Sequence, residues 1–518
     1  MKTLDSINDF SPKQAAIWFW LVVGSLATLW VILPTLFHWG YRDDALELQF
    51  IGKEWVLATR KHPMLPAWIL EIINILTNRA FAAPFIAAQL CAVISLWSVW
   101  RLGRQVLSEK LALLGIFAVT PYWYFTINST KFNQNNVLIM FWSLSIYFVF
   151  QAFQTRRLRY WIGAGAMLGL VLHAKYTAVF LIFAILVFTV LNTKTRGCWK
   201  GIYPYLTIFT AFLVFLPHLI WLYQNDWATL TYAQDRATGN TLNQTFFLFS
   251  PLSFLVSQIQ YLIPIVAILS PVLFFGNMKK RNLLSLSENE VKKTARQFLF
   301  ICWAIPLLCH IFIAAIFGSK LQNEYGVSFW LFFGTWLLLC FPINDTAKRF
   351  NLSVKFFVVL EIFLIALFFY ESLAVPYIDH KPRKNNFPMQ ELGAACDKIW
   401  SDYSLVSCLY VTGDWHLAGS AACMMKNRPS VHFYWQGIES PDAKPTGTWS
   451  TDEDVNQKGG MIIWTIPNNC DPNSYVPDWV HKRFPNAEVL AEPIILYYKT
   501  RAKVPPLKAK VAIITPRN

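Results

Sequence analysis

Long apolar runs separated by short polar joins fill the first 373 residues of the chain. We interpret eleven of these runs as helices that cross a membrane, because about 20 apolar residues span a bilayer as a helix. Two neighbouring runs are short, and they could be tilted or joined by a tight re-entrant corner. The runs lie at residues 15–38, 80–100, 110–127, 136–153, 161–174, 176–192, 202–222, 252–276, 297–317, 325–342 and 354–373. The pattern therefore predicts a polytopic α-helical membrane protein with about 11 transmembrane helices.

Residues 374–518 have a different pattern, in which Pro, Gly, Asn and Asp divide short apolar runs. Strand-like runs alternate with two helical segments, which favours a small α/β domain. The expected strands are 405–411, 431–435, 461–466, 488–498 and 510–515, and the expected helices are 388–400 and 415–426. We therefore divide the chain into a membrane module, residues 1–373, and a C-terminal α/β domain, residues 374–518.

The charge pattern sets an expected orientation for these parts. The chain has 45 Lys and Arg residues against 30 Asp and Glu residues, a net charge of +15. The basic residues form short clusters between apolar runs rather than one basic face, which argues against nucleic acid as a partner. The clusters at alternate joins place the N-terminus in the cytoplasm. With an odd number of spans, the C-terminal domain would be periplasmic in a bacterial inner membrane.

The join between the first two runs, residues 39–79, is expected outside and is rich in charge. Its pattern predicts two short amphipathic helices along the membrane surface. The break between them falls at His62-Pro63, since the residue before Pro avoids the helical region. Asp43 and Asp44 stand near the start of this join. A carboxylate there could accept a proton from an attacking hydroxyl; alternatively, both acids could cap the helix that follows them.

Three short elements occur in order along the membrane module. They are the acidic pair Asp43-Asp44, the segment Lys61-His62-Pro63-Met64-Leu65, and residues 169–176. With the odd number of spans and the outer C-terminal domain, they resemble the membrane glycosyltransferases of the GT-C fold. The nearest branch contains the protein O-mannosyltransferases and the aminoarabinose transferase of lipid A. The chain departs from that pattern at Asp44, where many members have Glu, and at Met64, where a second Pro is frequent.

The resemblance implies an enzyme that takes a sugar from a polyprenyl-phosphate carrier and passes it, with inversion, to an acceptor outside the membrane. It also implies that Asp43 is the general base for the acceptor hydroxyl and that Asp44 orients the site or binds the acceptor. The many outer cations favour an anionic acceptor or an anionic sugar. Lipid A or lipopolysaccharide core is the expected acceptor, with galacturonic acid, aminoarabinose or a hexose as the sugar. A protein O-mannosyltransferase-like enzyme and a transporter of envelope lipid precursors are the alternatives.

The leaving phosphate of such a reaction needs positive charge around it. The residues expected to bind substrate are Arg42, Lys61, His62, Lys131, His173, Lys175, Tyr176 and Lys320. Three of them have a plainer interpretation. Lys175 could be an interfacial lysine that extends its ammonium to water, His173 a structural histidine, and Lys131 part of a simple turn.

No His, Cys and Asp residues have metal-ligand spacing, so no metal or other cofactor is expected. A divalent ion between Asp43 and a phosphate is the remaining alternative. In the C-terminal domain, Gly413-Asp414-Trp415-His416 follows an expected strand. This segment could help to recognise the acceptor or could only cover the site, and Asp414 could simply cap the next helix.

Overall fold

The structure is a computed structural model that describes residues 10–238, 246–273, 290–317, 321–341, 343, 346–434, 437–440 and 443–516. Its contacts divide the chain into two compact units. Unit 1 comprises Met1–Val31, Ala88–Ser129 and Gln134–Ala366, and unit 2 comprises Ile32–Ala87, Thr130–Asn133 and Leu367–Asn518. The loop expected at residues 39–79 therefore belongs to the same compact unit as the C-terminal domain.

Helices make up unit 1, and each of the eleven predicted apolar runs contains at least one helix. Their bounds are α1 Pro12–Phe37, α4 Ala83–Val106, α5 Glu109–Val119, η1 Ile127–Lys131, α6 Gln134–Thr155, α7 Leu158–Ala174, η2 Tyr176–Ala178, α8 Val179–Leu191, α9 Thr193–Arg196, η3 Gly197–Lys200, α10 Tyr203–Gln224, α11 Ala228–Thr238, α12 Phe246–Leu273, α13 Glu290–Phe317, η5 Asn323–Gly326, α14 Phe333–Cys340 and α15 Ala347–Phe369. Four of them, α1, η1, α4 and α15, extend across the boundary between unit 1 and unit 2.

Within the described ranges, seven helices have the length and hydropathy of a membrane span. A pair of helical segments bent against each other, Tyr176–Leu191 and Thr193–Lys200, would count as an eighth span if it is taken as one. This is fewer than the eleven predicted runs, because the helices of four runs are short. Helices α5, α7, α8 and α14 have 11, 17, 13 and 8 residues. At a rise of about 1.5 Å per residue, the shorter ones cannot cross the hydrocarbon layer alone. The chain is nevertheless a multi-pass membrane protein, as predicted.

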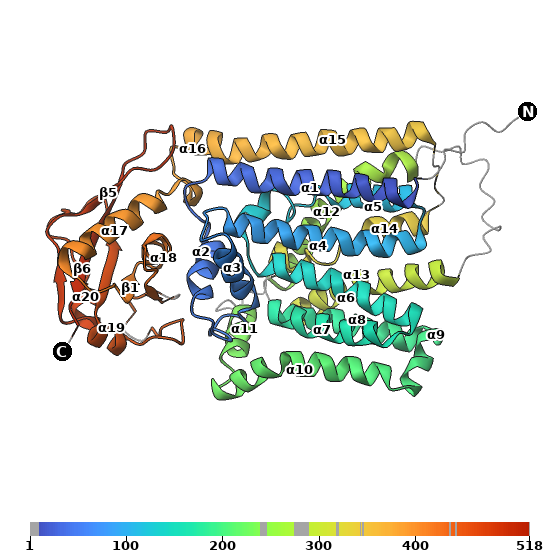
Figure 1. Ribbon diagram of the computed structural model, residues 1–518, viewed down its shortest axis with the longest axis horizontal. Helices are drawn as coiled ribbons and strands as arrows, with labels where there is room; N and C mark the ends of the chain where they lie inside the picture. Colours follow the sequence, from blue (N-terminus) through green and yellow to red (C-terminus); the bar gives the residue numbers. More distant parts are fainter. Residues whose placement is uncertain are drawn as a thin grey trace, which may run out of the picture. The chain divides into compact units, whose positions relative to one another are not determined.

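Several polar joins of unit 1 gather at one end of its helices, as the ribbon shows (Figure 1). These joins lie at residues 107–108, 156–157 and 192–202. The basic residues in and beside them include Arg104, Lys110, Arg156, Arg157, Lys194, Arg196 and Lys200. The clusters that the sequence assigned to one side of the membrane therefore do lie together.

Close packing of α7 against α10 depends on two glycines. A Cβ atom on Gly165 would lie 2.4 Å from the carbonyl oxygen of Thr207, and one on Gly169 would lie 2.7 Å from the Val214 Cβ. Small residues four positions apart let two helix backbones approach closely in a membrane. The next residue along this face of α7 is His173, which therefore also faces α10.

The loop of unit 2 forms two short helices, α2 (Asp43–Gly52) and α3 (Leu65–Leu76). The predicted pair of helices and the break at His62-Pro63 are confirmed. The predicted amphipathic pattern is wrong for α2, because residues 45–52 are all buried. The reason is tertiary, since α2 packs against both α3 and α18.

The C-terminal domain is built on one sheet with the strand order β2-β1-β3-β6-β4, and β5 pairs with β6. Strands β1, β2 and β3 are parallel, whereas β6 runs antiparallel to β3, β4 and β5. The strand bounds are β1 Tyr410–Gly413, β2 Ser430–His432, β3 Gly460–Thr465, β4 Ala487–Val489, β5 Ile494–Leu496 and β6 Leu507–Ile514. The other elements are η6 Tyr370–Ala374, α16 Val375–Ile378, η7 Lys384–Asn386, α17 Met389–Tyr403, α18 Trp415–Met424, α19 Asp452–Lys458 and α20 Asp478–Arg483.

The two expected helices of this domain are confirmed as α17 and α18. Four of the expected strands are present as β1, β2, β3 and β6, but the run 488–498 divides into β4 and β5. Pro493 stands between these two strands. A proline has no N–H to donate to a sheet, so it interrupts the run.

Arg428 ties the C-terminal domain to the loop within unit 2. Its two terminal nitrogens each donate to a carboxylate oxygen of Glu71 on α3, both at 2.8 Å. The two side chains are only 12% and 6% exposed. A bidentate pair of this kind fixes direction as well as distance.

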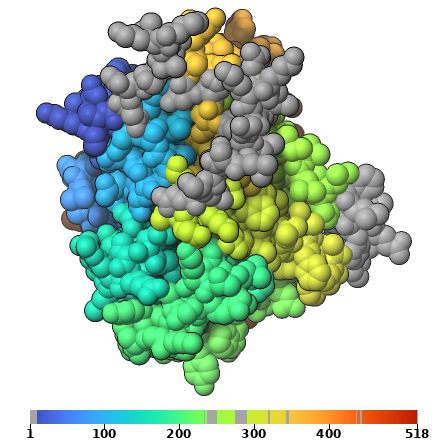
Figure 2. Space-filling model, turned by 90° about the vertical axis from the view of Figure 1, so that its right-hand side faces the viewer, coloured from blue at the N-terminus to red at the C-terminus, as the bar shows by residue number. Residues whose placement is uncertain are grey.

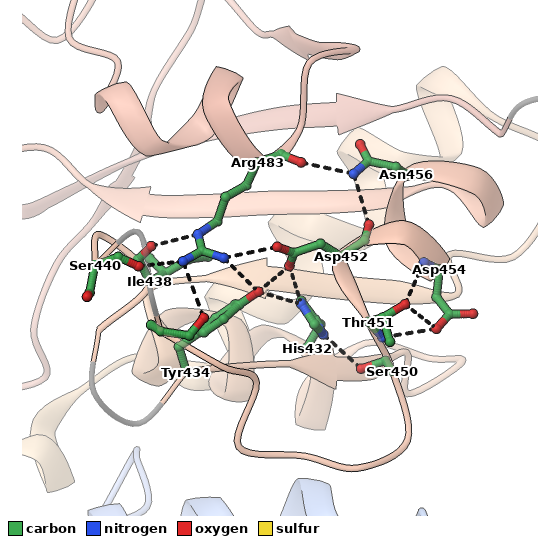
Figure 3. A network of polar contacts seen from close by, with 11 residues as sticks. His432, Tyr434, Ile438, Ser440, Ser450, Thr451, Asp452, Asp454, Asn456 and Arg483 are labelled. Atoms are coloured by element: carbon green, nitrogen blue, oxygen red, sulfur yellow. Dashed lines mark hydrogen bonds and ion pairs between the residues drawn. The ribbon is translucent and has the colours of Figure 1, made fainter.

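A second guanidinium, that of Arg483, holds the segment that follows β2 (Figure 3). It donates to the carbonyls of Ile438 and Ser440, to the hydroxyl of Tyr434 and, at 3.0 Å, to Asp452. These contacts satisfy the carbonyl groups of Ile438 and Ser440, neither of which lies in a strand.

The carboxyl group of Asp452 lies at the centre of this network. Burial alone would raise its pKa, but hydrogen bonds from His432, Tyr434 and Arg483 outweigh that effect and lower the pKa to about 2. The carboxylate is therefore ionised at any physiological pH. Since His432 lies at the end of β2, the network joins the sheet to α19 and α20.

Candidate functional site

The acidic pair occupies the first turn of α2. Arg42 is the residue before the helix, with extended backbone, and Asp43 and Asp44 are its first two residues. No side chain caps this helix start. The alternative that the two acids serve as caps is therefore not supported, although both are placed favourably for the positive end of the helix. Their carboxylates instead contact other parts of unit 2.

Asp43 forms an ion pair with Lys384 of the C-terminal domain. The Asp43 side chain is 46% exposed and that of Lys384 is 47% exposed. Asp44 accepts a hydrogen bond from the amide of Asn133 at 3.2 Å. The carboxylate proposed as a base thus has a cation beside it and can be reached from solvent.

Lys384 is held in place by backbone contacts rather than by its own side chain. The N–H groups of Trp39 and Gly40 both donate to the carbonyl of Asn385, at 2.7 and 3.2 Å. A Cβ atom on Gly40 would lie 2.4 Å from the carbonyl oxygen of Lys384, so only glycine permits this approach. The residues just before Asp43 therefore fix the position of Lys384.

Arg42 is a second cation next to the acids. Burial lowers its pKa, while the charges of Glu371, Asp43 and Asp44 raise it and that of Arg383 lowers it further. The guanidinium remains charged, because an arginine is protonated at any physiological pH. Arg42 can therefore contribute positive charge at the start of α2.

Lys61, expected to bind phosphate, is paired with Glu47 on α2 at 2.6 Å, and the two side chains are 9% and 4% exposed. Burial raises the pKa of Glu47, and the adjacent Lys61 opposes that shift. His62 belongs to a tight reversal, in which its carbonyl accepts from the N–H of Thr59 at 3.1 Å. The structure thus gives Lys61 and the backbone of His62 structural contacts, and their binding roles stay predictions.

A second polar group lies in unit 1 around Lys175. The ammonium donates to the Asn135 side chain at 2.8 Å and lies 4.8 Å from the centre of the Tyr325 ring. The Asn135 amide in turn donates to the Tyr124 hydroxyl at 2.8 Å and to Glu324 at 3.3 Å. The alternative of a lysine that merely extends to water does not fit these contacts. The segment that follows Lys131 contributes Asn135 here and Asn133 to the acidic pair.

His173 contacts α10, and Tyr176 contacts both α10 and α11. The Nε2 atom of His173 lies 3.0 Å from the carbonyl of Val214. The Tyr176 hydroxyl lies 2.5 Å from Nε2 of His218 and 2.6 Å from the hydroxyl of Thr229. These are helix-to-helix contacts, so the structure supports the plainer interpretation of His173 and leaves both binding roles as predictions.

Two expected cations remain. Lys131 ends η1 and is half-buried. Lys320 lies outside the described residues. Among the residues that are described, no group of three or more His, Cys, Asp and Glu side chains could hold a metal ion. The expectation that the reaction needs no metal stays a prediction.

Lys384 is the main residue that the sequence did not reveal. It lies 341 positions from Asp43 along the chain. It belongs to a short segment with no motif, Lys381-Pro382-Arg383-Lys384. Only the fold of unit 2 brings it to the acidic pair.

Comparisons with known proteins agree with this fold. Residues 61–221 match the family model described as dolichyl-phosphate-mannose-protein mannosyltransferase. The crystal structure of ArnT from Cupriavidus metallidurans bound to undecaprenyl phosphate is similar over 98% of this chain and 99% of that one, with a TM-score of 0.59 and 12% identity. No curated protein matches the sequence.

A second solved structure is also similar, the cryo-EM structure of the arabinofuranosyltransferase AftD from mycobacteria. The match covers 100% of this chain but only 41% of AftD, with a TM-score of 0.51 and 11% identity. The chain thus has the predicted GT-C fold with a small C-terminal α/β domain. The family match together with this fold indicates a glycosyltransferase.

Proposed function

We propose that this chain is an inverting glycosyltransferase that moves a sugar from a polyprenyl-phosphate carrier to an envelope glycolipid. The observation that carries the proposal is the carboxylate of Asp43, which is reachable from solvent, is paired with Lys384 and interacts with the charge of Arg42. Lipid A or lipopolysaccharide core is the proposed acceptor. The ArnT structure, described as bound to undecaprenyl phosphate, supports a carrier of that class.

In the proposed reaction, Asp43 takes the proton of the acceptor hydroxyl. The hydroxyl oxygen bonds to the anomeric carbon from the side opposite the phosphate. The bond between that carbon and the phosphate oxygen breaks, and the carrier leaves as polyprenyl phosphate with the electron pair. The product is a stable anion, so the site needs cations rather than an acid at the leaving group.

Two groups of side chains suit the remaining tasks. Asn133 holds Asp44, which would orient the start of α2 or bind the acceptor. In unit 1, Lys175 is a cation surrounded by amide and phenol groups, which suits a phosphate. We propose it as a donor-binding residue.

The proposed orientation follows the positive-inside rule. The end of unit 1 that gathers the basic joins would face the cytoplasm of a bacterial inner membrane (Figure 2). The N-terminus would lie on that side and the C-terminal domain in the periplasm.

A protein acceptor is the second candidate, because the matching family model is described as a protein mannosyltransferase. Mass spectrometry of envelope glycolipids and of envelope proteins, from cells with and without the gene, separates the two. A mass difference of one sugar on a glycolipid supports the proposal, whereas a difference found only on proteins contradicts it.

A further inference from the structure

The surface around Lys384 contains more than a partner for Asp43. The ammonium of Lys384 lies 5.2 Å from the centre of the Trp415 ring. The Trp415 side chain is partly exposed at the first turn of α18. A cation and an indole ring thus lie together beside the carboxylate of Asp43, all within unit 2.

Trp415 stands on a rigid turn. Asp414 caps α18 by accepting from the N–H groups of His416 and Leu417 at 3.0 and 3.3 Å. Its second carboxylate oxygen accepts from the Thr465 hydroxyl at 3.1 Å. The prediction that Asp414 caps the next helix is therefore confirmed, and the same residue joins the end of β1 to the end of β3.

Gly413 makes this turn possible. Its φ is +119°, and a Cβ atom there would lie 2.0 Å from the carbonyl oxygen of Ile463. Any other residue would strain the turn and collide with β3. The direction of Trp415 is therefore set by the sheet.

The turn lies where ligands commonly bind to sheets of this kind. The chain leaves β1 to form β2 on one side, and then returns to form β3 on the other side of β1. At such a switch point the two connections diverge and leave a crevice at the carboxyl ends of the strands. Gly413 and Thr465 are the last residues of β1 and β3, so Trp415 stands next to the carboxyl ends of these two strands.

His416 provides an independent indication of a ligand site, because one of its ring nitrogens lacks a hydrogen-bond partner within the described part of the chain. Its Nε2 atom is buried and has no hydrogen-bond partner among the described residues. Burial lowers the pKa of His416 to about 4, helped by Lys384 and opposed by Asp414 and Asp43. The ring is therefore neutral near pH 7, and it lies in the field of the same three charged groups. A ligand hydroxyl could satisfy its buried nitrogen.

The pair formed by Lys384 and Asp43 is suited to exchange. Both side chains are nearly half exposed, and ion pairs of this kind contribute little net free energy. Another anion could therefore take the Lys384 ammonium from Asp43 at low cost. Release of Asp43 would also free it to accept a proton.

We propose that Lys384, Trp415 and His416 form an acceptor subsite for a sugar ring that carries a phosphate or carboxylate group. Lys384 binds the anionic group, and the apolar C–H face of the sugar packs on the electron-rich face of Trp415. Binding of the anion draws Lys384 away from Asp43. The proposal rests on the proposed function, because it places the acceptor beside the base of that reaction.

Binding can be measured without turnover, on the full chain in detergent, with glucose 6-phosphate, glucose and inorganic phosphate as probes. We expect Lys384→Gln to weaken glucose 6-phosphate about tenfold, since a hydrogen bond to a charged group contributes that much, and to leave glucose nearly unchanged. Trp415→Ala should weaken both sugars, and Trp415→Phe should recover part of the loss. Lys381→Gln, in the same segment and exposed, is the matched control and should bind as the parent does.

The proposal is overturned if glucose 6-phosphate binds equally to the parent, Lys384→Gln and Trp415→Ala, provided that thermal unfolding shows all three folded. It is also overturned if Lys381→Gln weakens binding as much as Lys384→Gln does. Binding of inorganic phosphate as tight as that of glucose 6-phosphate would mean an anion site without sugar recognition, and would likewise reject the subsite.

Steady-state kinetics identify which substrate supplies the anion. Lys384→Gln should raise the KM for the acceptor and leave the KM for the polyprenyl-phosphate donor unchanged. A raised donor KM instead would assign Lys384 to the carrier phosphate and reject the acceptor subsite. Failure of the proposed function is a separate outcome, because the envelope glycolipids of cells with and without the gene would then not differ by one sugar, whatever the binding measurements show.

Discussion

Two carboxylates on α2, Asp43 and Glu47, lie one helical turn apart and each pairs with a lysine, yet their surroundings differ. Asp43 and Lys384 are 46% and 47% exposed. Glu47 and Lys61 are 4% and 9% exposed. Each pair joins a carboxylate to a lysine ammonium, so the two pairs differ in the exposure of their side chains and not in the kind of contact.

Burial decides what each pair can do. Breaking a buried pair by removing one partner leaves an uncompensated charge, which is strongly unfavourable. An exposed pair can exchange its partner for water or another ion at little cost. We therefore expect Glu47 and Lys61 to hold the loop together, and Asp43 and Lys384 to take part in binding and chemistry.

The largest effect should come from Asp43→Asn, which removes the proposed base but keeps its shape. We expect transfer to fall by about 10²- to 10⁴-fold, the usual contribution of general base catalysis, with little change in unfolding temperature. A radiolabelled transfer assay in detergent measures this. Asp379→Asn is the matched control, because Asp379 also pairs with a cation, Arg383, and is 45% exposed. Near-normal turnover of Asp43→Asn would remove it as the base.

Glu47→Gln and Lys61→Met should act mainly on stability. Each leaves one buried charge without its partner, so we expect a loss of about 3–5 kcal/mol in the free energy of unfolding. The double variant Glu47→Leu/Lys61→Met should recover much of that loss, since no charge is left buried. Thermal unfolding in detergent tests this.

The same variants test the predicted role of Lys61 in phosphate binding. If the pair is only structural, the double variant keeps the parent's KM for the carrier. A raised carrier KM in a stable double variant would show that Lys61 also binds the phosphate.

A third pair, Arg483 with Asp452, lies between these extremes, at 13% and 32% exposure. The folded-state pKa of Asp452 is lowered to about 2 from an ordinary 3.8. A lowered pKa contributes stability that is present above the ordinary value and is lost as the pH falls toward 2. Unfolding temperatures between pH 5 and pH 2 should fall less steeply in Asp452→Asn than in the parent. Parallel curves for the two proteins would contradict this.

The smallest effect is expected from Asn133→Ala, which removes the hydrogen bond to Asp44. A hydrogen bond to a charged group contributes about 1.5–3 kcal/mol, and less where water can replace it, so we expect about a tenfold loss of kcat/KM. Asn225→Ala, in unit 1 at the end of α10, is a control of the same residue type. An equal loss in both variants would indicate a general loss of folded protein rather than an effect on Asp44.

The sequence predicted those parts of the fold that depend on local pattern. Apolar runs located the helices of unit 1, and strand-like runs located β1, β2, β3 and β6. It missed the division at Pro493 because the apolar content on both sides suggested one strand. It also gave α2 an exposed face, since it could not show that α18 covers that helix.

The candidate site was predictable only in part. Asp43 and Asp44 were found from their position after an apolar run. Lys384 carried no local signal, because its role depends on the contacts of Trp39 and Gly40 with a segment far along the chain. Lys61 matched a motif, but its contact with Glu47 became visible only in the folded loop.

By itself, the sequence determined the membrane-spanning character, the α/β pattern of the C-terminal domain and the acidic start of α2, because each depends on residues that are neighbours in the chain. Only the tertiary structure decided that Asp43 is exposed and faces Lys384 while Glu47 is buried against Lys61. The physical reason is that the exposure of a charge is set by the elements that pack around it. Those elements come from distant parts of the sequence.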